Sequence, residues 1–227
     1  MAWQGRRVGV VIVAGGSGSR MGADVPKQFL LLSGQPILLH TIRAFEPYAD
    51  EMVVVLPAGQ VERWREMAHE CNIEASHKVC VGGASRFESV RNGLAALGEC
   101  DLVAIQDGVR PLLSAKMIER GLECAASHGT AIPIVDAVDS FRIAEGDTLA
   151  VIDRSRLKAV QTPQIFAAEG LRKAYEAEAD ARFTDDATVV ELAGQKLAYY
   201  DGERRNIKIT TPEDLIIAEA LLGTKER

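Results

Sequence analysis

The chain has 227 residues, of which 47% are hydrophobic and 26% are charged, and its formal net charge at pH 7 is −6. This length and composition suit one folded domain with a substantial core, and they exclude a disordered or fibrous chain. The negative net charge argues against a general nucleic-acid binder, which usually carries a basic face.

The cysteines and the apolar stretches indicate an intracellular, water-soluble protein. The four cysteines include no C-x-x-C pair and stand at Cys71, Cys80, Cys100 and Cys124. Disulfide frameworks need a denser pattern and zinc sites need close pairs, so we expect free thiols in a reducing compartment. The longest apolar runs have the length of strands, so we expect no signal peptide, no membrane association and a cytoplasmic location.

Short runs rich in Val and Ile alternate with longer helical patterns in the first part of the chain. Strands are predicted at Val8–Val13, Met52–Leu56, Lys78–Val81, Leu102–Ile105 and Ala131–Val135. Helices are predicted between them, at Ile37–Phe45, Val61–Cys71, Arg86–Leu97 and Ala115–Ser127. This alternation predicts an α/β domain with a mostly parallel, twisted sheet and helices on both faces. Ligands of such sheets bind beyond the carboxyl ends of the strands.

The alternation stops between residues 136 and 161. Residues 140–143 and 149–152 are predicted to be two strands around the polar turn 145–148. We therefore expect a β-hairpin that is inserted in the domain, lies outside the main sheet, and either packs as a flap or projects toward a partner.

Helical patterns return after the hairpin. We predict helices at Ala167–Glu178 and Asp185–Leu192, a strand at Leu197–Tyr200, and a last helix from Thr211. The last helix has an N-cap, a proline in its first turn and two acidic residues after it. The chain shows no repeat and no linker, so we predict one domain over residues 1–227 with residues 136–161 as the inserted hairpin.

A glycine-rich loop follows the first predicted strand and runs from Ala14 to Gly22, with Pro26-Lys27-Gln28 close behind it. Glycines after a buried strand let backbone N–H groups approach phosphate oxygens. The loop lacks the Gly-Lys-Ser/Thr of a Walker A motif, and Met21 occupies the third glycine position of a dinucleotide-binding loop. The basic residues Arg20 and Lys27 favour a loop that binds a nucleoside triphosphate over a loop that is only a structural turn.

These residues carry a resemblance to a known family. The stretch from Ala14 to Gln28 resembles the signature of nucleotidyltransferases that activate sugars and polyols. Its form G-S-G-S-R-M-G followed by P-K-Q-F is similar to the 2-C-methyl-D-erythritol 4-phosphate cytidylyltransferases of the non-mevalonate isoprenoid route. Further matches follow in order over nearly the whole chain, at Gly82-Gly83, Ser85-Arg86, Ser89, residues 107–111, Asp153-Arg154, residues 162–164, residues 184–186, residues 206–208 and residues 211–214.

The resemblance implies a fold, an activity and a cofactor. It implies a single Rossmann-like nucleotidyltransferase domain that transfers CMP from CTP to 2-C-methyl-D-erythritol 4-phosphate and releases pyrophosphate, with Mg²⁺ held mainly by the CTP phosphates. A ribitol 5-phosphate cytidylyltransferase is the close alternative, because both acceptors are short phosphorylated polyols. An NAD-dependent Rossmann oxidoreductase and a catalytically silent nucleotide-binding module are more distant alternatives.

The resemblance also assigns residues to roles. Arg20, Lys27 and Lys208 would be catalytic. The nucleotide would contact Ala14, Gly15, Gly16, Gly18, Gly82, Gly83, Ser89 and Gly108. The polyol phosphate would contact Asp107, Arg110, Ser140, Arg154 and Thr184, with Asp107 also a candidate metal ligand. The hairpin resembles an arm that crosses to a second subunit and completes the neighbour's site in a homodimer.

Two of these assignments have structural alternatives. The hydroxyl of Ser85 or Ser89 could merely cap the helix that begins near Arg86. Arg110 could belong to a structural turn with a surface arginine.

Overall fold

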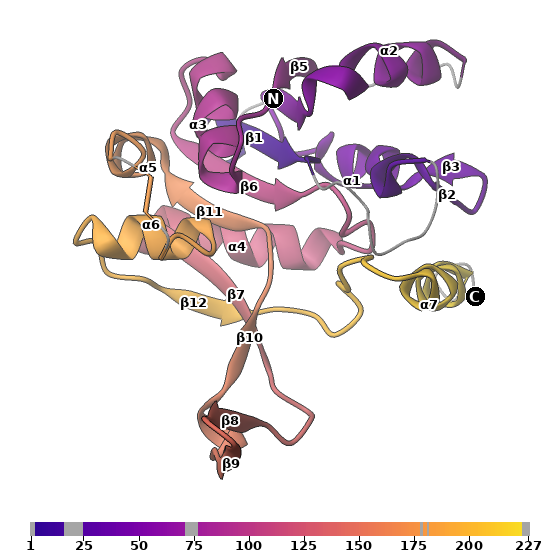
Figure 1. Cartoon of the computed structure of the whole chain (residues 1–227). Helices are drawn as coiled ribbons and strands as arrows, with labels where there is room; N and C mark the ends of the chain where they lie inside the picture. The colour runs from indigo at the N-terminus through magenta and orange to yellow at the C-terminus, as the bar shows by residue number, and fades with distance from the viewer. Residues whose placement is uncertain (1–2, 16–24, 71–76, 178, 181, 224–227) are drawn as a thin grey trace.

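A central sheet of eight strands organises the computed structural model, which describes residues 3–15, 25–70, 77–177, 179–180 and 182–223 (Figure 1). Seven strands lie in the order β10–β7–β11–β6–β1–β4–β5, and β12 pairs with β7. The strands are β1 (Val8–Val13), β4 (Glu51–Leu56), β5 (Lys78–Val81), β6 (Leu102–Asp107), β7 (Thr130–Asp136), β10 (Lys158–Val160), β11 (Gln164–Ala167) and β12 (Tyr199–Asp201). Only β10 and β11 pair antiparallel with their neighbours, so the predicted mostly parallel sheet is confirmed.

Helices cover both faces of the sheet, as predicted. One face packs against α1 (Ile37–Phe45), α2 (Val61–Glu70) and α4 (Ala115–His128). The other packs against α3 (Arg86–Ala96), α5 (Ala168–Ala174) and α6 (Asp186–Leu192). Successive side chains of a strand point to opposite faces. Val10 and Ile12 accordingly join the first core while Val11 joins the second, so β1 is buried on both sides.

A third, smaller core lies beside the carboxyl edge of the sheet. The last helix, α7 (Pro212–Gly223), packs there with the short strands β2 (Leu31–Leu32) and β3 (Gln35–Pro36). Its first turn is held by the Asp214 carboxylate, which accepts the backbone N–H groups of Thr210 and Thr211 at 2.8 Å each. Three 3₁₀ turns complete the described elements: η2 (Lys27–Phe29), η3 (Ala58–Gln60) and η4 (Arg154–Arg156).

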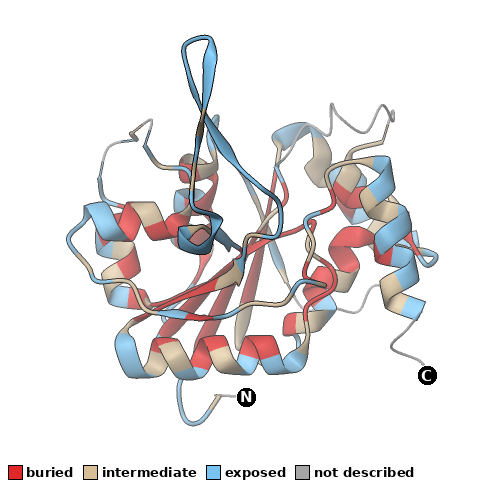
Figure 2. Ribbon diagram, turned by 90° about the horizontal axis from the view of Figure 1, so that it is seen from below, coloured by how far each residue is buried: buried red, intermediate tan, exposed pale blue. Residues whose placement is uncertain are grey.

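The insertion predicted at residues 136–161 lies outside the main sheet except for its ends, because Asp136 ends β7 and Lys158–Val160 forms β10; residues 137–157 are called the arm below. Its strands β8 (Arg142–Glu145) and β9 (Thr148–Val151) pair antiparallel around the turn Gly146-Asp147, where Gly146 has a φ of +60°. Each strand lies close to its predicted position but is shifted by one or two residues. The arm projects away from the body, and its side chains are mostly exposed (Figures 1 and 2). Leu149 is 63% exposed and Val151 is 77% exposed, so apolar surface on the arm is open.

Several elements differ from the sequence prediction, among them β2, β3 and β10, which were not predicted. Strand β11, which was not predicted, lies antiparallel between β6 and β7. It begins directly after Pro163, and a proline usually indicates a turn. The predicted helix Ala167–Glu178 is the shorter α5, which ends at Ala174 because the buried Tyr175 turns the chain back into the second core. Within the described residues, no helix is long and apolar enough to cross a bilayer.

Candidate active site

A cavity of about 360 Å³ opens at the carboxyl edge of the sheet, beyond β1, β4, β5 and β6. The register places Val13, the last residue of β1, opposite both Val55 and Asp107, so these strands end level with one another. The loops that follow them therefore converge on one space. Among the residues assigned to the site from the sequence, those lining the cavity are Ala14, Gly15, Lys27, Gly82, Gly83, Ser89, Asp107 and Lys208.

Lys27 reaches the cavity from the turn η2, which Gln28 fastens to the end of β1. The Gln28 side chain is fully buried, and its Nε2 donates a hydrogen bond of 2.9 Å to the carbonyl oxygen of Ala14. Ala14 in turn donates its N–H to the carbonyl oxygen of Val55 at 2.9 Å. Lys27 is thereby held beside the start of the glycine-rich loop. The assigned residues Gly16, Gly18 and Arg20 lie outside the described residues.

The loop between β5 and α3 is braced by Ser89. Its hydroxyl accepts the N–H of Gly83 at 3.1 Å and donates to the carbonyl oxygen of Ser85 at 2.8 Å. The helix cap is Ser85, whose hydroxyl accepts the N–H of Glu88 while the Glu88 carboxylate accepts the N–H of Ser85. The capping alternative therefore holds for Ser85 and not for Ser89. A hydroxyl oxygen has two lone pairs, so Ser89 keeps one for a ligand.

The backbone of this loop approaches the cavity closely. A Cβ atom at Gly82 would lie 2.8 Å from the Ser89 hydroxyl oxygen and 3.3 Å from a methyl group of Val55. Glycine is therefore the residue that fits there. The N–H of Gly82 donates to the carbonyl oxygen of Leu56 at 2.8 Å and the N–H of Gly83 donates to Ser89, so both of these backbone donors are already used within the protein.

Three cations surround the Asp107 carboxylate at the end of β6. Its Oδ2 accepts from Lys208 Nζ at 3.0 Å and from Arg110 Nε at 3.2 Å, and its Oδ1 lies 4.0 Å from Arg86 Nε. Burial favours the neutral carboxyl, but the positive charges of Lys208, Arg86 and Arg110 together outweigh burial, so the pKa of Asp107 lies below its ordinary value. Asp107 is therefore a carboxylate at neutral pH, and it fixes the Lys208 ammonium at the cavity wall.

Arg110 and Gly108 support the cavity without lining it. Arg110 links Asp107 to the segment before Lys208, because its guanidinium also donates to the carbonyl oxygen of Asn206 at 2.8 Å. A Cβ atom at Gly108 would lie 2.9 Å from the Cβ of Ala14, so Gly108 packs against Ala14 instead of opening to the cavity. Arg110 is only 12% exposed at its side chain, so the alternative of a surface arginine is wrong.

Three assigned residues lie away from the cavity of their own chain. Ser140 and Arg154 are exposed on the arm, where Arg154 donates to the carbonyl oxygen of Val138 at 2.8 Å. Thr184 is exposed just before α6, and its hydroxyl lies 3.4 Å from that of Thr188. One chain alone does not bring these residues to the cavity.

Some residues that line the cavity received no role from the sequence, and Gln28 and Arg86 are the two whose side chains bear most on its structure. Gln28 and Arg86 both line the cavity, and both stand inside the motifs that carry the family resemblance. Their position in those motifs was the signal that could have found them. Asp186, which pairs with Arg86, also stands in one of these motifs, residues 184–186, but an acid in the first turn of a helix has an ordinary explanation, so its pairing was not predicted.

Comparison with known proteins decides the family. The family model described as IspD: 2-C-methyl-D-erythritol 4-phosphate cytidylyltransferase matches residues 8–224. The chain belongs to this cytidylyltransferase family. A 2-C-methyl-D-erythritol 4-phosphate cytidylyltransferase of Bacteroides thetaiotaomicron is 45% identical over 215 residues, covering 94% of this chain and 98% of that protein. One of Porphyromonas gingivalis is 46% identical over 213 residues, covering 93% and 96%.

A solved structure agrees with this assignment. The crystal structure of 2-C-methyl-D-erythritol 4-phosphate cytidylyltransferase from Thermus thermophilus superposes with a TM-score of 0.78 at 34% identity, covering 95% of this chain and 98% of that one. The Rossmann-like nucleotidyltransferase fold expected from the resemblance is therefore confirmed, and the chain is a cytidylyltransferase.

The residues of this cytidylyltransferase fit a divalent cation that is held mainly by a ligand. The part of the chain that the structure describes contains no cluster of three or more His, Cys, Asp or Glu residues that could hold a metal ion. Asp107 is the one carboxylate among the described residues lining the cavity. The protein thus offers about one oxygen ligand here, which suits Mg²⁺ because this ion commonly keeps its waters and binds substrate phosphates.

Proposed function

We propose that this chain transfers CMP from CTP to 2-C-methyl-D-erythritol 4-phosphate, forming 4-diphosphocytidyl-2-C-methyl-D-erythritol and releasing pyrophosphate in the non-mevalonate route to isoprenoid precursors. The observation that carries this proposal is the cavity in which Lys27, Asp107 and Lys208 face glycine-lined backbone, in a chain of the cytidylyltransferase family. Two cations around an open backbone suit a triphosphate and a second phosphorylated substrate.

The base would lie against the loop between β5 and α3. Cytosine differs from uracil in presenting an amine where uracil presents a carbonyl, so selection of cytosine needs an acceptor at that point. Ala14, Gly15 and Gly82 line the cavity, and backbone carbonyl oxygens there, with the remaining lone pair of Ser89, can supply acceptors. This arrangement supports CTP as the nucleotide.

The transfer needs positioning and positive charge more than it needs acid–base chemistry. A phosphate oxygen of the polyol attacks the α-phosphorus of CTP, a new P–O bond forms, and the bond from that phosphorus to the bridging oxygen breaks as pyrophosphate leaves. Negative charge gathers on the phosphoryl oxygens during this step. Lys27 at η2 and Lys208 beside Asp107 would stabilise that charge from two sides of the cavity.

Mg²⁺ would supply further charge neutralisation at the CTP phosphates, with Asp107 as its one candidate protein ligand. The Asp107 carboxylate has a second task in the protein itself. By binding Lys208 at 3.0 Å, it keeps that ammonium in place before the acceptor phosphate arrives.

The arm would complete the site of a second subunit, which makes the active unit a homodimer. The arm carries exposed apolar side chains at Val138, Leu149 and Val151, and a hairpin with such a surface is marginal in water unless it packs on something larger. A pair of arms exchanged about a two-fold axis would bury both surfaces at once. Ser140 and Arg154 would then approach the polyol phosphate of the neighbour.

The deciding experiment is a pyrophosphate-release assay with CTP, Mg²⁺ and a set of polyol phosphates, with product masses determined. The proposal expects efficient turnover with 2-C-methyl-D-erythritol 4-phosphate and a product that carries the cytidylyl group. Faster turnover with ribitol 5-phosphate would replace the proposed acceptor by the close alternative. Tight nicotinamide-nucleotide binding without pyrophosphate release would favour the oxidoreductase, although Pro57 stands where its ribose-binding acid would lie.

A further inference from the structure

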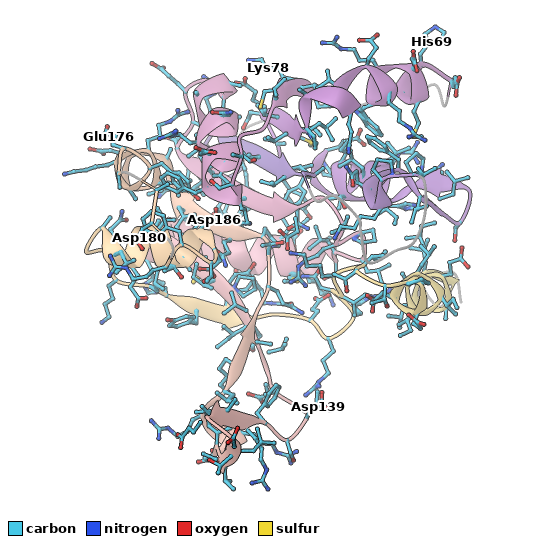
Figure 3. The ribbon with its side chains drawn as sticks, in the orientation of Figure 1. His69, Lys78, Asp139, Glu176, Asp180 and Asp186 are labelled. Carbon is cyan, nitrogen blue, oxygen red and sulfur yellow. The ribbon has the colours of Figure 1, made fainter. Side chains whose placement is uncertain are left out.

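A buried carboxylate on α6 reaches the cavity through one arginine. Asp186, the first residue of α6, is fully buried and lies in the body of the molecule, whereas Asp139 lies out on the arm (Figure 3). The Asp186 carboxylate accepts two hydrogen bonds from the Arg86 guanidinium, from Nη1 to Oδ1 at 2.9 Å and from Nη2 to Oδ2 at 2.6 Å. The hydroxyl of Tyr175 donates to Oδ1 at 2.6 Å.

Capping does not account for this carboxylate. The N-cap of α6 is Asp185, which accepts the N–H of Thr188 at 2.9 Å. A buried ion pair is also weak evidence of a stability role, because well-packed apolar residues often stabilise a protein at least as well. We therefore look for the role of the Asp186 charge in the cavity that its partner Arg86 lines.

Arg86 connects Asp186 to the charges of the cavity. Its side chain lines the cavity, and its Nε lies 4.0 Å from Oδ1 of Asp107, the carboxylate that also binds Lys208 and Arg110. An arginine binds a carboxylate best through two parallel hydrogen bonds. With both terminal nitrogens on Asp186, Arg86 has only Nε left to face Asp107.

We propose that Asp186 is a positioning residue for the transfer of CMP: it holds Arg86 in the cavity wall and keeps it from taking Asp107 away from Lys208 and Arg110. This inference rests on the proposed function, since it concerns the same reaction. Asp186 itself touches neither substrate; it acts through Arg86 and Asp107. Asp186 binds Arg86, and Asp107 binds Lys208 and Arg110. This pairing determines the position of the Lys208 ammonium.

The protonation states suit this arrangement. Burial opposes the charge on Arg86, but the Asp186 and Asp107 carboxylates outweigh burial, and the pKa of Arg86 lies above its ordinary value. Burial, together with the nearby negative charge of Asp186, raises the pKa of Tyr175 as well. The guanidinium is therefore charged and the phenol is a donor across the neutral pH range.

The test is the kinetics of folded variants. Asp186→Asn keeps the size of the side chain and removes its charge, so Arg86 is released toward Asp107. We expect kcat to fall on the order of 10-fold to 100-fold, with a smaller change in KM for CTP, because the groups that meet the transition state are displaced. Arg86→Lys cannot make the two-point contact with Asp186, so its cation is free to approach Asp107, and this variant should also lose kcat. Tyr175→Phe retains the ion pair and should turn over close to the wild-type rate.

A double variant separates positioning from folding. If the Asp186→Asn loss comes from Arg86 competing for Asp107, then Arg86→Gln combined with Asp186→Asn should recover part of the lost kcat. Thermal unfolding of each variant is measured alongside, and kinetics are taken well below the lowest transition. If folded Asp186→Asn has the wild-type kcat, the inference is wrong. If Asp186→Asn does not fold, a wild-type kcat in Arg86→Lys overturns the inference. If the kcat of the double variant is no higher than that of Asp186→Asn, the inference is also overturned. Wild-type protein that releases no pyrophosphate refutes the proposed function instead.

Discussion

Charges converge on Asp107, and the residues around it show how the cavity is held ready for phosphates. Lys208 and Arg110 share one of its oxygens, and Arg86 faces the other. Lys27 stands apart from this group, on a turn that Gln28 fastens to β1. The basic side chains of the described cavity are thus positioned from separate parts of the chain, which suits a ligand with several phosphate groups.

Removal of Lys27 should impair catalysis much more than folding. In Lys27→Ala we expect kcat to fall by a factor of about 10² to 10³, since loss of one charge-stabilising contact in a transition state typically costs about 2.7–4 kcal/mol. Turnover is measured by pyrophosphate release and folding by thermal unfolding. Lys116→Ala, which alters an exposed lysine on α4, is the matched control and should leave both unchanged. Near-normal turnover of Lys27→Ala would remove Lys27 from the triphosphate site.

The stability contributed by Asp107 should depend on pH with a definite sign. Its pKa is lowered in the folded protein from the ordinary value of 3.8, against the effect of burial, by Lys208, Arg86 and Arg110. A lowered pKa gives stability that is present above the ordinary pKa and is lost as the pH falls through the folded value. The difference in unfolding free energy between wild type and Asp107→Asn should therefore shrink below about pH 4.

Denaturant unfolding at a series of pH values measures this difference. Glu123→Gln, at an exposed carboxylate on α4, is the control and should change the unfolding free energy little. A wild-type advantage over Asp107→Asn that grows as the pH falls would contradict the assigned sign.

At the scale of elements, the loop between β5 and α3 is shaped by its own hydrogen bonds. The reciprocal pair of Ser85 and Glu88 begins the helix, and Ser89 ties the loop back on itself. The base-binding surface proposed for this loop thus depends on a serine that is not needed as the cap.

Ser89→Ala should weaken the preference for CTP over UTP. The substitution removes the acceptor of the Gly83 N–H, whereas the carbonyl of Ser85 keeps the backbone N–H of Ser89 at 3.0 Å. We expect the ratio of kcat/KM values for the two nucleotides to fall on the order of 10-fold. Ser114→Ala removes the cap of α4 instead and should lower stability by about 1 kcal/mol without changing the ratio. An unchanged ratio in Ser89→Ala would refute the assigned base pocket.

At the scale of the whole molecule, the arm is the part that projects away from the body of its own chain (Figures 1 and 2). It leaves the body through β7 and returns through β10, and Ser140 and Arg154 are exposed residues of it. If the arm serves a neighbour, a site is built from the body of one subunit and the arm of another.

Two inactive variants should then complement each other. Arg154→Ala damages the arm and Lys208→Ala damages the body, so a mixed dimer holds one site with both parts intact. After subunit exchange we expect up to about a quarter of wild-type activity, because half of randomly formed dimers are mixed and each has one sound site. Lys27→Ala mixed with Lys208→Ala is the control and should stay inactive, since both lesions are in bodies. No recovery despite demonstrated exchange would show that Arg154 does not act across the interface.

The sequence by itself determined the body of the fold and most of one cavity. Continuous apolar runs such as Val8–Val13 predict buried parallel strands, and the ends of those strands locate Ala14, Gly82 and Asp107 at one edge. These inferences succeed because the local sequence of apolar residues indicates which strands are buried and how they run.

Only the tertiary structure decided the pairings between distant segments. Strand β11 runs antiparallel between β6 and β7, and its short apolar run carries no information about its partners. Arg86 and Asp186 are 100 positions apart, at the starts of two different helices, and nothing local indicates that they pair. The sequence states which residues are charged, but the energy of a buried charge depends on what the fold places beside it.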